Sequence, residues 1–204
     1  MSPVTTLVFD VGNVLIRWEP TRLYRRLFPD PAQCDAFLAT ICTEDWNREM
    51  DRGRPFAEGI AELVGRHPDR ASEIRAWDEH WHEMVPGEIA GTVAILARVR
   101  ARGIPDYAIT NFSREKYAEA RERFPFLKGF RDTVVSAHER LLKPDPAIYR
   151  VLFERNRLDP AACLFIDDTA ANVEGARSVG MRAVVFTSPE RLIEDLSAHG
   201  LDLG

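Results

Sequence analysis

The chain has 204 residues, of which 45% are hydrophobic and 29% are charged, a composition typical of a globular protein with one domain or a domain carrying an insertion. The formal net charge of −5 predicts no basic surface for nucleic acid or an anionic membrane, so a small molecule is the expected partner. No window approaches the roughly 18 apolar residues that span a bilayer, and no signal segment is recognised, so we expect a cytoplasmic location. The sequence carries no signal for an oligomeric state.

The first predicted element is a short strand that ends at an acid. An apolar run from Thr6 leads to Asp10, and a turn through Gly12 follows. A carboxylate in this place lies at the carboxyl end of a strand, where open α/β sheets bind ligands. Asp is also a common turn and helix-capping residue, so this position alone is a weak indication of a site.

Residues 18–85 predict a helical insertion between the first strand and the rest of the sheet. Apolar residues recur there at helical spacing, without a convincing strand. The apolar sets are Leu23/Leu27, Phe37/Ile41, Trp46/Met50, Ile60/Leu63/Val64 and Ile74/Trp77/Trp81/Met84. We expect Trp77 and Trp81 to belong to the core of the insertion, and we expect His80 and His82, which flank Trp81, to be solvated and not to bind a metal.

From residue 86 onward, helical and strand patterns alternate. The predicted helices are Glu88–Arg102, Arg114–Phe124, Pro146–Asn156, Ala171–Val179 and Pro189–Ala198, and the predicted strands are Tyr107–Ile109, Thr133–Val135, Cys163–Ile166 and Arg182–Phe186. This alternation predicts an α/β domain with a parallel sheet and right-handed crossovers. Gly103, Gly180 and Gly200 stand where helix C-caps are expected.

The three cysteines, Cys34, Cys42 and Cys163, are odd in number and lack metal-type spacing. We therefore expect three reduced thiols.

Three further groups of polar residues follow in chain order, namely Thr110-Asn111, Lys143-Pro144 and Asp167-Asp168. Two adjacent carboxylates repel each other unless a cation or hydrogen-bond donors compensate them, so the Asp pair favours a metal site. Lys143 precedes a proline, which biases it toward an extended conformation outside a helix. The alternative interpretation of the Thr-Asn and Asp-Asp pairs is a turn or a helix cap, and a single surface lysine would indicate nothing.

Taken together, these motifs resemble the haloacid dehalogenase superfamily, and the resemblance covers nearly the whole chain. The position of the insertion matches subfamilies with a small helical cap, and the segments Asp10–Val14 and Asp167–Ala176 are most similar to sugar-phosphate phosphatases of the glucose-1-phosphate phosphatase type. The resemblance implies a Rossmann-like catalytic core formed by residues 1–17 and 86–204, with residues 18–85 as the cap.

The resemblance also implies a chemistry, in which Asp10 attacks a phosphate monoester and forms an aspartyl-phosphate intermediate. A phosphate dianion repels a carboxylate until cations neutralise it, and Mg²⁺ is suited to that task. The implied magnesium ligands are Asp10, Asp168 and the main-chain carbonyl of Gly12, with Asp167 bound directly or through water. Thr110, Asn111 and Lys143 are the implied substrate-binding residues, Lys143 also serves Asp10 in catalysis, and Asn172 is expected to orient the carboxylates. The expected substrate is a small phosphorylated metabolite, with a sugar phosphate favoured.

Gly12 departs from the usual arrangement, because a second acid two positions after Asp10 would be the natural proton donor. Glycine keeps the carbonyl oxygen for the metal and lacks the acid, and positioned acid–base catalysis is worth about 10² to 10⁴ in rate. Either another group protonates the leaving oxygen, or the substrate has an acidic leaving group, as a sugar-1-phosphate or an acyl phosphate does.

Two alternatives to the phosphatase remain at this stage. A 2-haloacid dehalogenase would suit the missing acid, Lys143, Asn111 and Tyr149, but it calls for Ser or Asn where this chain has the Asp pair. A binding protein with the same fold and no turnover is the other alternative. The insertion is expected to set substrate choice, and the side chains that could reach the site are Trp18, Trp46, Arg48 and Asp51.

Overall fold

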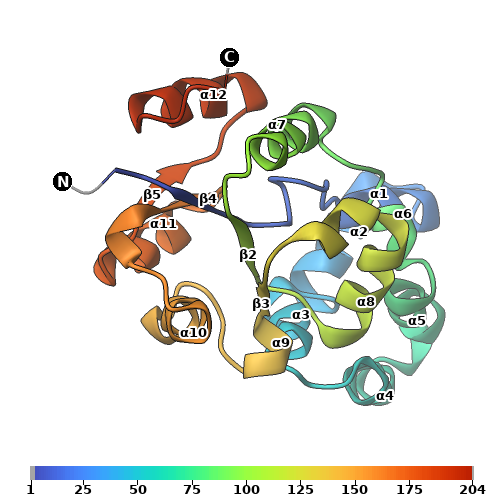
Figure 1. Cartoon of the computed structure of the whole chain (residues 1–204). Helices are drawn as coiled ribbons and strands as arrows, with labels where there is room; N and C mark the ends of the chain where they lie inside the picture. The colour runs from blue at the N-terminus through green and yellow to red at the C-terminus, as the bar shows by residue number, and fades with distance from the viewer. Residues whose placement is uncertain (1–2, 204) are drawn as a thin grey trace.

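A computed structural model describes residues 3–203 and shows a five-stranded parallel sheet between two layers of helices (Figure 1). The strand order is β3-β2-β1-β4-β5, and every recorded pairing is parallel. The strands are β1 (Thr6–Phe9), β2 (Asp106–Thr110), β3 (Thr133–Val135), β4 (Cys163–Asp167) and β5 (Arg182–Val185). The predicted α/β class is confirmed.

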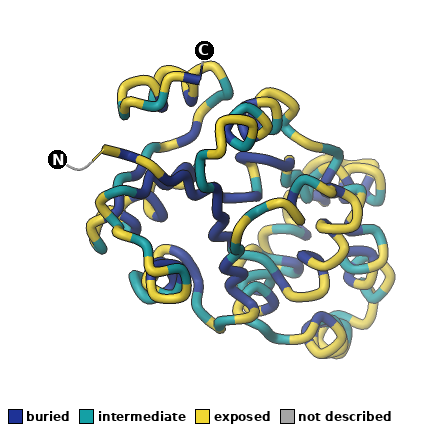
Figure 2. The backbone as a smooth tube through the Cα atoms, in the orientation of Figure 1, coloured by how far each residue is buried: buried dark blue, intermediate teal, exposed yellow. Residues whose placement is uncertain are grey.

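The two faces of the sheet carry separate apolar clusters because successive side chains of a strand point to opposite faces. In β1, Leu7 and Phe9 belong to one cluster and Val8 to the other. Residues of α7 (Ala90–Ala101), α8 (Arg114–Arg123) and α12 (Pro189–Ala198) pack in the first cluster, and those of α10 (Pro146–Asn156) and α11 (Ala170–Ser178) in the second. The central strands are therefore buried on both sides (Figure 2), as expected for a parallel sheet.

Six helices lie between β1 and α7, with no strand among the described residues of that segment. They are α1 (Pro20–Leu27), α2 (Pro31–Thr40), α3 (Glu44–Asp51), α4 (Phe56–Arg66), α5 (Ala71–Glu79) and α6 (Trp81–Met84), and a 3₁₀ turn at Pro68–Arg70 joins α4 to α5. Helices thus occupy the segment predicted as a helical insertion, and residues 18–85 are called the insert below. Trp77 is 2% exposed and packs edge-on against Trp46, as predicted for a core residue.

The insert is held against the sheet domain by specific polar contacts. The Ser136 hydroxyl, at the start of α9 (Ser136–Glu139), donates to the carbonyl oxygen of Asp51 at 2.6 Å. The Lys116 ammonium of α8 lies 2.7 Å from the Asp78 carboxylate of α5. Arg123, also on α8, donates to a carbonyl oxygen of α6. The first contact fixes α3 beside α9 at the end of β3 (Figure 1), and the other two hold α5 and α6 against α8.

A few elements differ from the sequence prediction for identifiable reasons. Helix α7 begins at Ala90 and not at Glu88, because Glu88 forms an isolated bridge with Ile16. Three short helical elements were not predicted, because fewer than two helical turns show no readable helical period; these are α9, Pro125–Gly129 and Pro160–Ala162. The predicted C-cap glycines at 103, 180 and 200 all have positive φ, and the three cysteines are free thiols as expected.

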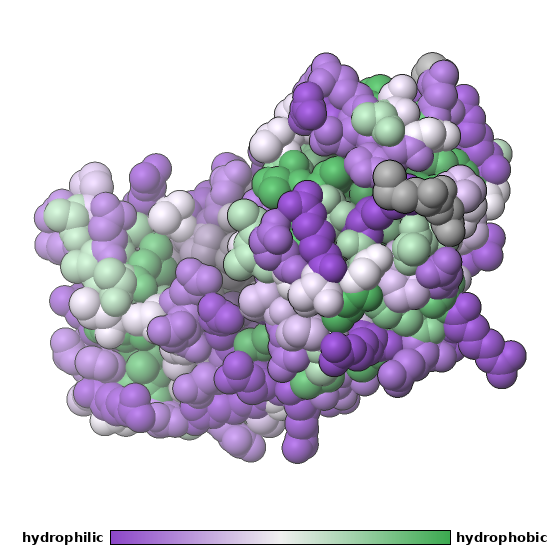
Figure 3. Space-filling model, turned by 90° about the vertical axis from the view of Figure 1, so that its left-hand side faces the viewer, coloured by the Kyte–Doolittle hydropathy of each residue, from purple (hydrophilic) through white to green (hydrophobic). Residues whose placement is uncertain are grey.

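The surface fits the 29% content of charged residues. The face in Figure 3 is mostly hydrophilic, with hydrophobic residues in separated patches. No helix in the described part of the chain has the length and apolar character that crossing a membrane requires.

Gly53 allows the insert to approach the sheet domain closely. Its φ is +103°, and a Cβ there would lie 2.8 Å from the carbonyl oxygen of Ala137. We predict that Gly53→Ala lowers the free energy of unfolding by about 1–3 kcal/mol, because alanine disfavours this φ and meets backbone. Gly65→Ala is the matched control: a Cβ at Gly65, inside α4, meets nothing within 4 Å, so we expect a gain of about 0.5–1 kcal/mol. Urea unfolding measures both, and a neutral Gly53 variant would contradict the close docking.

Candidate functional site

The site forms where the central strands β1 and β4 end side by side. Asp10 directly follows β1, and its backbone N–H donates to the carbonyl oxygen of Ile166 in β4 at 2.9 Å. Asp167 is the last residue of β4. The pairing of these strands therefore brings the predicted nucleophile and the predicted Asp pair together, although they are far apart in the sequence.

Lys143 joins the two carboxylates in the interior. Its ammonium lies 2.8 Å from Asp10 Oδ1 and 2.7 Å from Asp167 Oδ2. Lys143 is 2% exposed, Asp10 7% and Asp167 0%. Charged groups so deeply buried are stable only when paired and hydrogen-bonded, so each member of this ion triad depends on the others.

The Asp167 carboxylate is fully engaged by donors. The Thr169 N–H donates to Oδ1 at 2.8 Å, and the Asn172 side-chain amide lies 3.0 and 3.1 Å from the two oxygens. These contacts, together with Lys143, fix the orientation of the carboxylate and confirm that Asn172 orients it. With its oxygens so occupied, Asp167 suits contact with a metal ion through water better than direct ligation.

Asn111 positions the Lys143 segment. Its side-chain amide donates to the Lys143 carbonyl oxygen at 3.1 Å, and its side-chain oxygen accepts from the Lys143 N–H at 2.8 Å. Asn111 lines the cavity between the sheet domain and the insert. Thr110, the last residue of β2, is 1% exposed and does not line this cavity. The side chain of Asn111 is thus used to hold Lys143, and this contact between distant segments was not predicted.

Asp168 completes a group of three acids. One carboxylate oxygen from each of Asp10, Asp167 and Asp168 lies within 4.8 Å of the others. Asp168 also receives a hydrogen bond from the Asn13 side chain, and Asn13 has a φ of 54° in the turn after β1. Next to it, the space that a Cβ of Gly12 would occupy is open, with no atom within 4 Å. The residues predicted to hold a metal ion are therefore gathered in one place.

The electrostatics of this group favour a bound cation. Burial raises the pKa of Asp10 to about 7 although Lys143 lowers it, and burial and the neighbouring Asp167 raise the pKa of Asp168. Burial opposes the charge of Lys143, but Asp10 and Asp167 outweigh it and raise its pKa. Three carboxylates and one ammonium leave two negative charges uncompensated, which is the charge that one divalent cation neutralises. Oxygen donors of this kind suit Mg²⁺.

A cavity of about 590 Å³ opens above these residues between the sheet domain and the insert, a volume within the usual range for small-molecule sites. As expected, Trp18, Arg48 and Asp51 line it. Trp46 does not: its indole N–H donates to the Gly59 carbonyl oxygen within the insert core, so its assignment to the site is corrected. Residues not predicted also line the cavity: Asn13, Asn47, Ser113 and Lys116. Of these four residues, only Ser113 belongs to a type that the sequence marks, because serine is a common helix N-cap.

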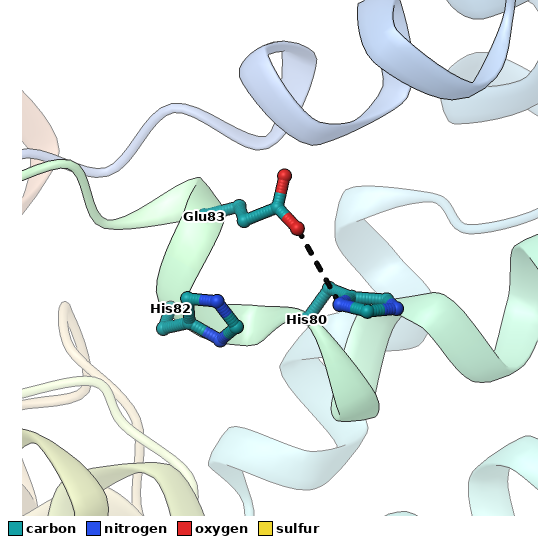
Figure 4. Close-up of side chains that lie close together, drawn as sticks. All are labelled: His80, His82 and Glu83. Carbon is teal, nitrogen blue, oxygen red and sulfur yellow. Dashed lines mark ion pairs between the residues drawn. The ribbon is translucent and has the colours of Figure 1, made fainter.

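His80, His82 and Glu83 form a second group with metal-ligating atoms, within 4.8 Å of one another at the surface (Figure 4). His80 lies 3.4 Å from Glu83. Both oxygens of Glu83 accept hydrogen bonds from the Arg26 guanidinium at 2.8 Å. The carboxylate is thus already paired with a cation that would repel a metal ion.

The comparison with protein families decides the class of the chain. A family model for haloacid dehalogenase-like hydrolases matches residues 4–180. The chain belongs to this family. The haloacid dehalogenase-like hydrolase fold also explains why the site lies at the carboxyl edge of the parallel sheet, where Asp10 and the Asp pair meet.

Individual proteins are similar to this chain in sequence or in structure. The hydrolase is 29% identical over 207 residues to acyl-CoA dehydrogenase family member 10 of Mus musculus, in an alignment that covers 94% of this chain and 19% of that protein. It is 25% identical over 181 residues to the sesquiterpene phosphatase astK of Aspergillus oryzae, with 88% of each chain covered. A crystal structure of HAD family enzyme bt-2542 from Bacteroides thetaiotaomicron, a magnesium complex, superposes with a TM-score of 0.71 at 19% identity, covering 92% of this chain and 95% of that one. The structural match shows the shared fold.

Removing the ammonium of the ion triad should destabilise the protein strongly. We predict that Lys143→Met, measured by urea unfolding at neutral pH without divalent ions, lowers the free energy of unfolding by about 3–5 kcal/mol, because two buried carboxylates lose their cation. Lys128→Met is the control, since Lys128 pairs with Glu122 at the exposed surface, and its cost should stay below about 1 kcal/mol. Equal stability of the two variants would contradict a buried triad.

Proposed function

We propose that this hydrolase is a magnesium-dependent phosphatase that acts on a small phosphorylated metabolite, with a sugar phosphate as the favoured substrate, through an aspartyl-phosphate on Asp10. The observation that carries the proposal is the Lys143 ammonium between Asp10 and Asp167 at the floor of the cavity, with Asp168 beside them. A 2-haloacid dehalogenase has no need of this third carboxylate.

Asp10 suits the role of nucleophile because its carboxylate is held in one orientation. The Val11 N–H and the Lys143 ammonium both contact Oδ1, at 2.6 and 2.8 Å, so Oδ2 is the oxygen directed to other partners. Lys143 favours the ionised form of Asp10, and the same ammonium can interact with the oxygens of a phosphoryl group on Asp10. The amide pair between Asn111 and Lys143 keeps the ammonium in place during the reaction.

The acids fit magnesium by number, charge and donor chemistry. Asp10, Asp168 and the Gly12 carbonyl would hold the ion directly, and Asp167 through water. When bound, Mg²⁺ neutralises phosphate charge and so allows one anion to approach another. The remaining task falls to Lys143, which supplies the second positive charge beside the transferred group.

The wall of the cavity supports a sugar phosphate. Trp18 lines it together with polar side chains of α3, namely Asn47, Arg48 and Asp51, whereas Trp81 is 2% exposed and belongs to the core as predicted. A sugar ring has apolar C–H faces and a rim of hydroxyl groups, so an aromatic surface beside hydrogen-bond donors and acceptors matches both features.

A substrate screen with and without metal tests the proposal. We predict phosphate release from sugar phosphates in the presence of Mg²⁺, loss of this activity with a chelator and recovery on adding Mg²⁺, because the uncompensated carboxylates repel the substrate. Prenyl and aryl phosphates and 2-haloacids complete the screen. Asp10→Asn should be folded and inactive, whereas Asp45→Asn, which changes an exposed acid of α3, should keep its activity.

Three outcomes would contradict the proposal. Normal phosphate release in the presence of a chelator would show that the reaction needs no metal ion. Halide release without metal would indicate a dehalogenase. A folded protein that converts no compound of the screen would indicate a binding protein.

A further inference from the structure

The site has the parts for phosphoryl transfer to Asp10 but no acid at position 12 to protonate the oxygen that leaves. Four carboxyl groups line the cavity, those of Asp10, Glu44, Asp51 and Asp168. Asp10 and Asp168 are the nucleophile and a metal ligand of the proposed function, and Glu44 is exposed in the first turn of α3. Asp51, at the other end of that helix, is the carboxyl group without an assigned task.

Asp51 is held at the carboxyl edge of the sheet by contacts on both its main chain and its side chain. Its carbonyl oxygen accepts from the Ser136 hydroxyl at 2.6 Å, directly after β3. Its carboxyl group accepts from the backbone N–H of Ser113, three residues beyond the end of β2, and from the Asn47 side chain at 3.2 Å. The close approach of Gly53 to Ala137 fixes the same turn. Asp51 is thus part of the insert and is anchored beside the loop that carries Asn111.

On the basis of the proposed phosphatase reaction, we propose that Asp51 is the general acid of this enzyme, taking the role of the acid that Gly12 lacks. As Asp10 attacks phosphorus, the bond from phosphorus to the ester oxygen breaks, and that oxygen takes the proton of the Asp51 carboxyl group. In the second half, the Asp51 carboxylate takes a proton from the water that attacks phosphorus. The bond from phosphorus to Asp10 breaks, and phosphate, the free alcohol, the Asp10 carboxylate and the Asp51 carboxyl group result.

The surroundings of Asp51 allow it to hold a proton near neutral pH. Burial raises its pKa to about 7, while the Ser113 N–H and the Arg48 guanidinium act in the other direction. Its hydrogen-bond partners, the Asn47 side chain and the Ser113 N–H, are uncharged amides. Three helices around Asp51 carry further charged or titratable groups. They are Glu44, Asp45, Arg48 and Glu49 on α3, Arg114, Glu115, Lys116, Tyr117, Glu119, Arg121, Glu122 and Arg123 on α8, and His138 and Glu139 on α9.

This assignment links protonation to the position of the insert. The Lys116–Asp78 ion pair and the Ser136–Asp51 hydrogen bond hold the insert on the sheet domain. The acid is in place only when these contacts are made, so the proton is available only when the site is covered and water is excluded.

A series of phosphate esters with graded leaving-group pKa tests the proposal. For the unmodified, magnesium-loaded protein we expect kcat/KM to depend only weakly on leaving-group pKa, because the departing oxygen is protonated. Asp51→Asn keeps the shape of the side chain and removes the acidic proton. We expect kcat/KM to fall by about 10² to 10⁴ for primary alkyl phosphates. For an aryl phosphate, whose leaving group needs no proton, we expect a fall of less than about tenfold. Asp45→Asn, on the same helix and outside the cavity, should keep the weak dependence.

A relocated acid separates catalysis from a purely structural role of Asp51. Position 12 has open space for a side chain. We therefore expect Gly12→Asp in the Asp51→Asn background to raise kcat/KM for alkyl phosphates at least tenfold above that of Asp51→Asn alone. A docking role alone predicts no such rescue and an equal loss on every ester.

Each result bears on a separate claim. A steep dependence of kcat/KM on leaving-group pKa in the unmodified protein overturns the assignment of Asp51, even if Asp51→Asn does not fold. If the Asp51→Asn variant shows the same dependence as the unmodified protein, the assignment is overturned too. Absence of metal-dependent phosphatase activity in the unmodified protein refutes instead the proposed function.

Discussion

The buried contact of Lys143 with Asp10 and Asp167 is the constraint on which the site depends. An ammonium and two carboxylates at 2.8 and 2.7 Å, removed from water, persist only if strand ends and loops keep them together, because the desolvation of each charge is large. Backbone N–H groups hold the two carboxylates, Val11 on Asp10 and Thr169 on Asp167, and the side-chain amide of Asn111 holds the main chain of Lys143.

The order of the strands makes this contact possible. β1 lies between β2 and β4, so the residues after these three strands meet at one edge, with β3 and its following helix next to them. In the proposed reaction the insert supplies a wall for the substrate and a source of protons. Its helix α3 reaches that edge of the sheet through the hydrogen bond from Ser136 to Asp51. The sheet domain thus supplies charge, and the insert supplies the surroundings of the leaving group.

The sequence predicted the parts of this arrangement that are written in short, local patterns. The alternation of apolar residues predicted the sheet and its helices, and polar residues after strands indicated Asp10 and the Asp pair. Lys143, in a loop before a proline, was singled out through the family resemblance. Contacts between distant segments have no local signal, and for this reason the Asn111–Lys143 and Asp51–Ser113 pairs were not predicted. The same limit explains Trp46, whose aromatic side chain fits a cavity wall as well as a core until Gly59 is known to lie beside it.

The central claim is that Asp10, whose ionised form Lys143 favours, forms a covalent bond to the phosphoryl group. Rapid acid quenching of the magnesium-loaded protein during turnover, followed by peptide mass spectrometry, tests it directly. The account predicts a phosphoryl group on the peptide that contains Asp10, at Asp10 itself. A phosphoryl group on another residue would contradict it.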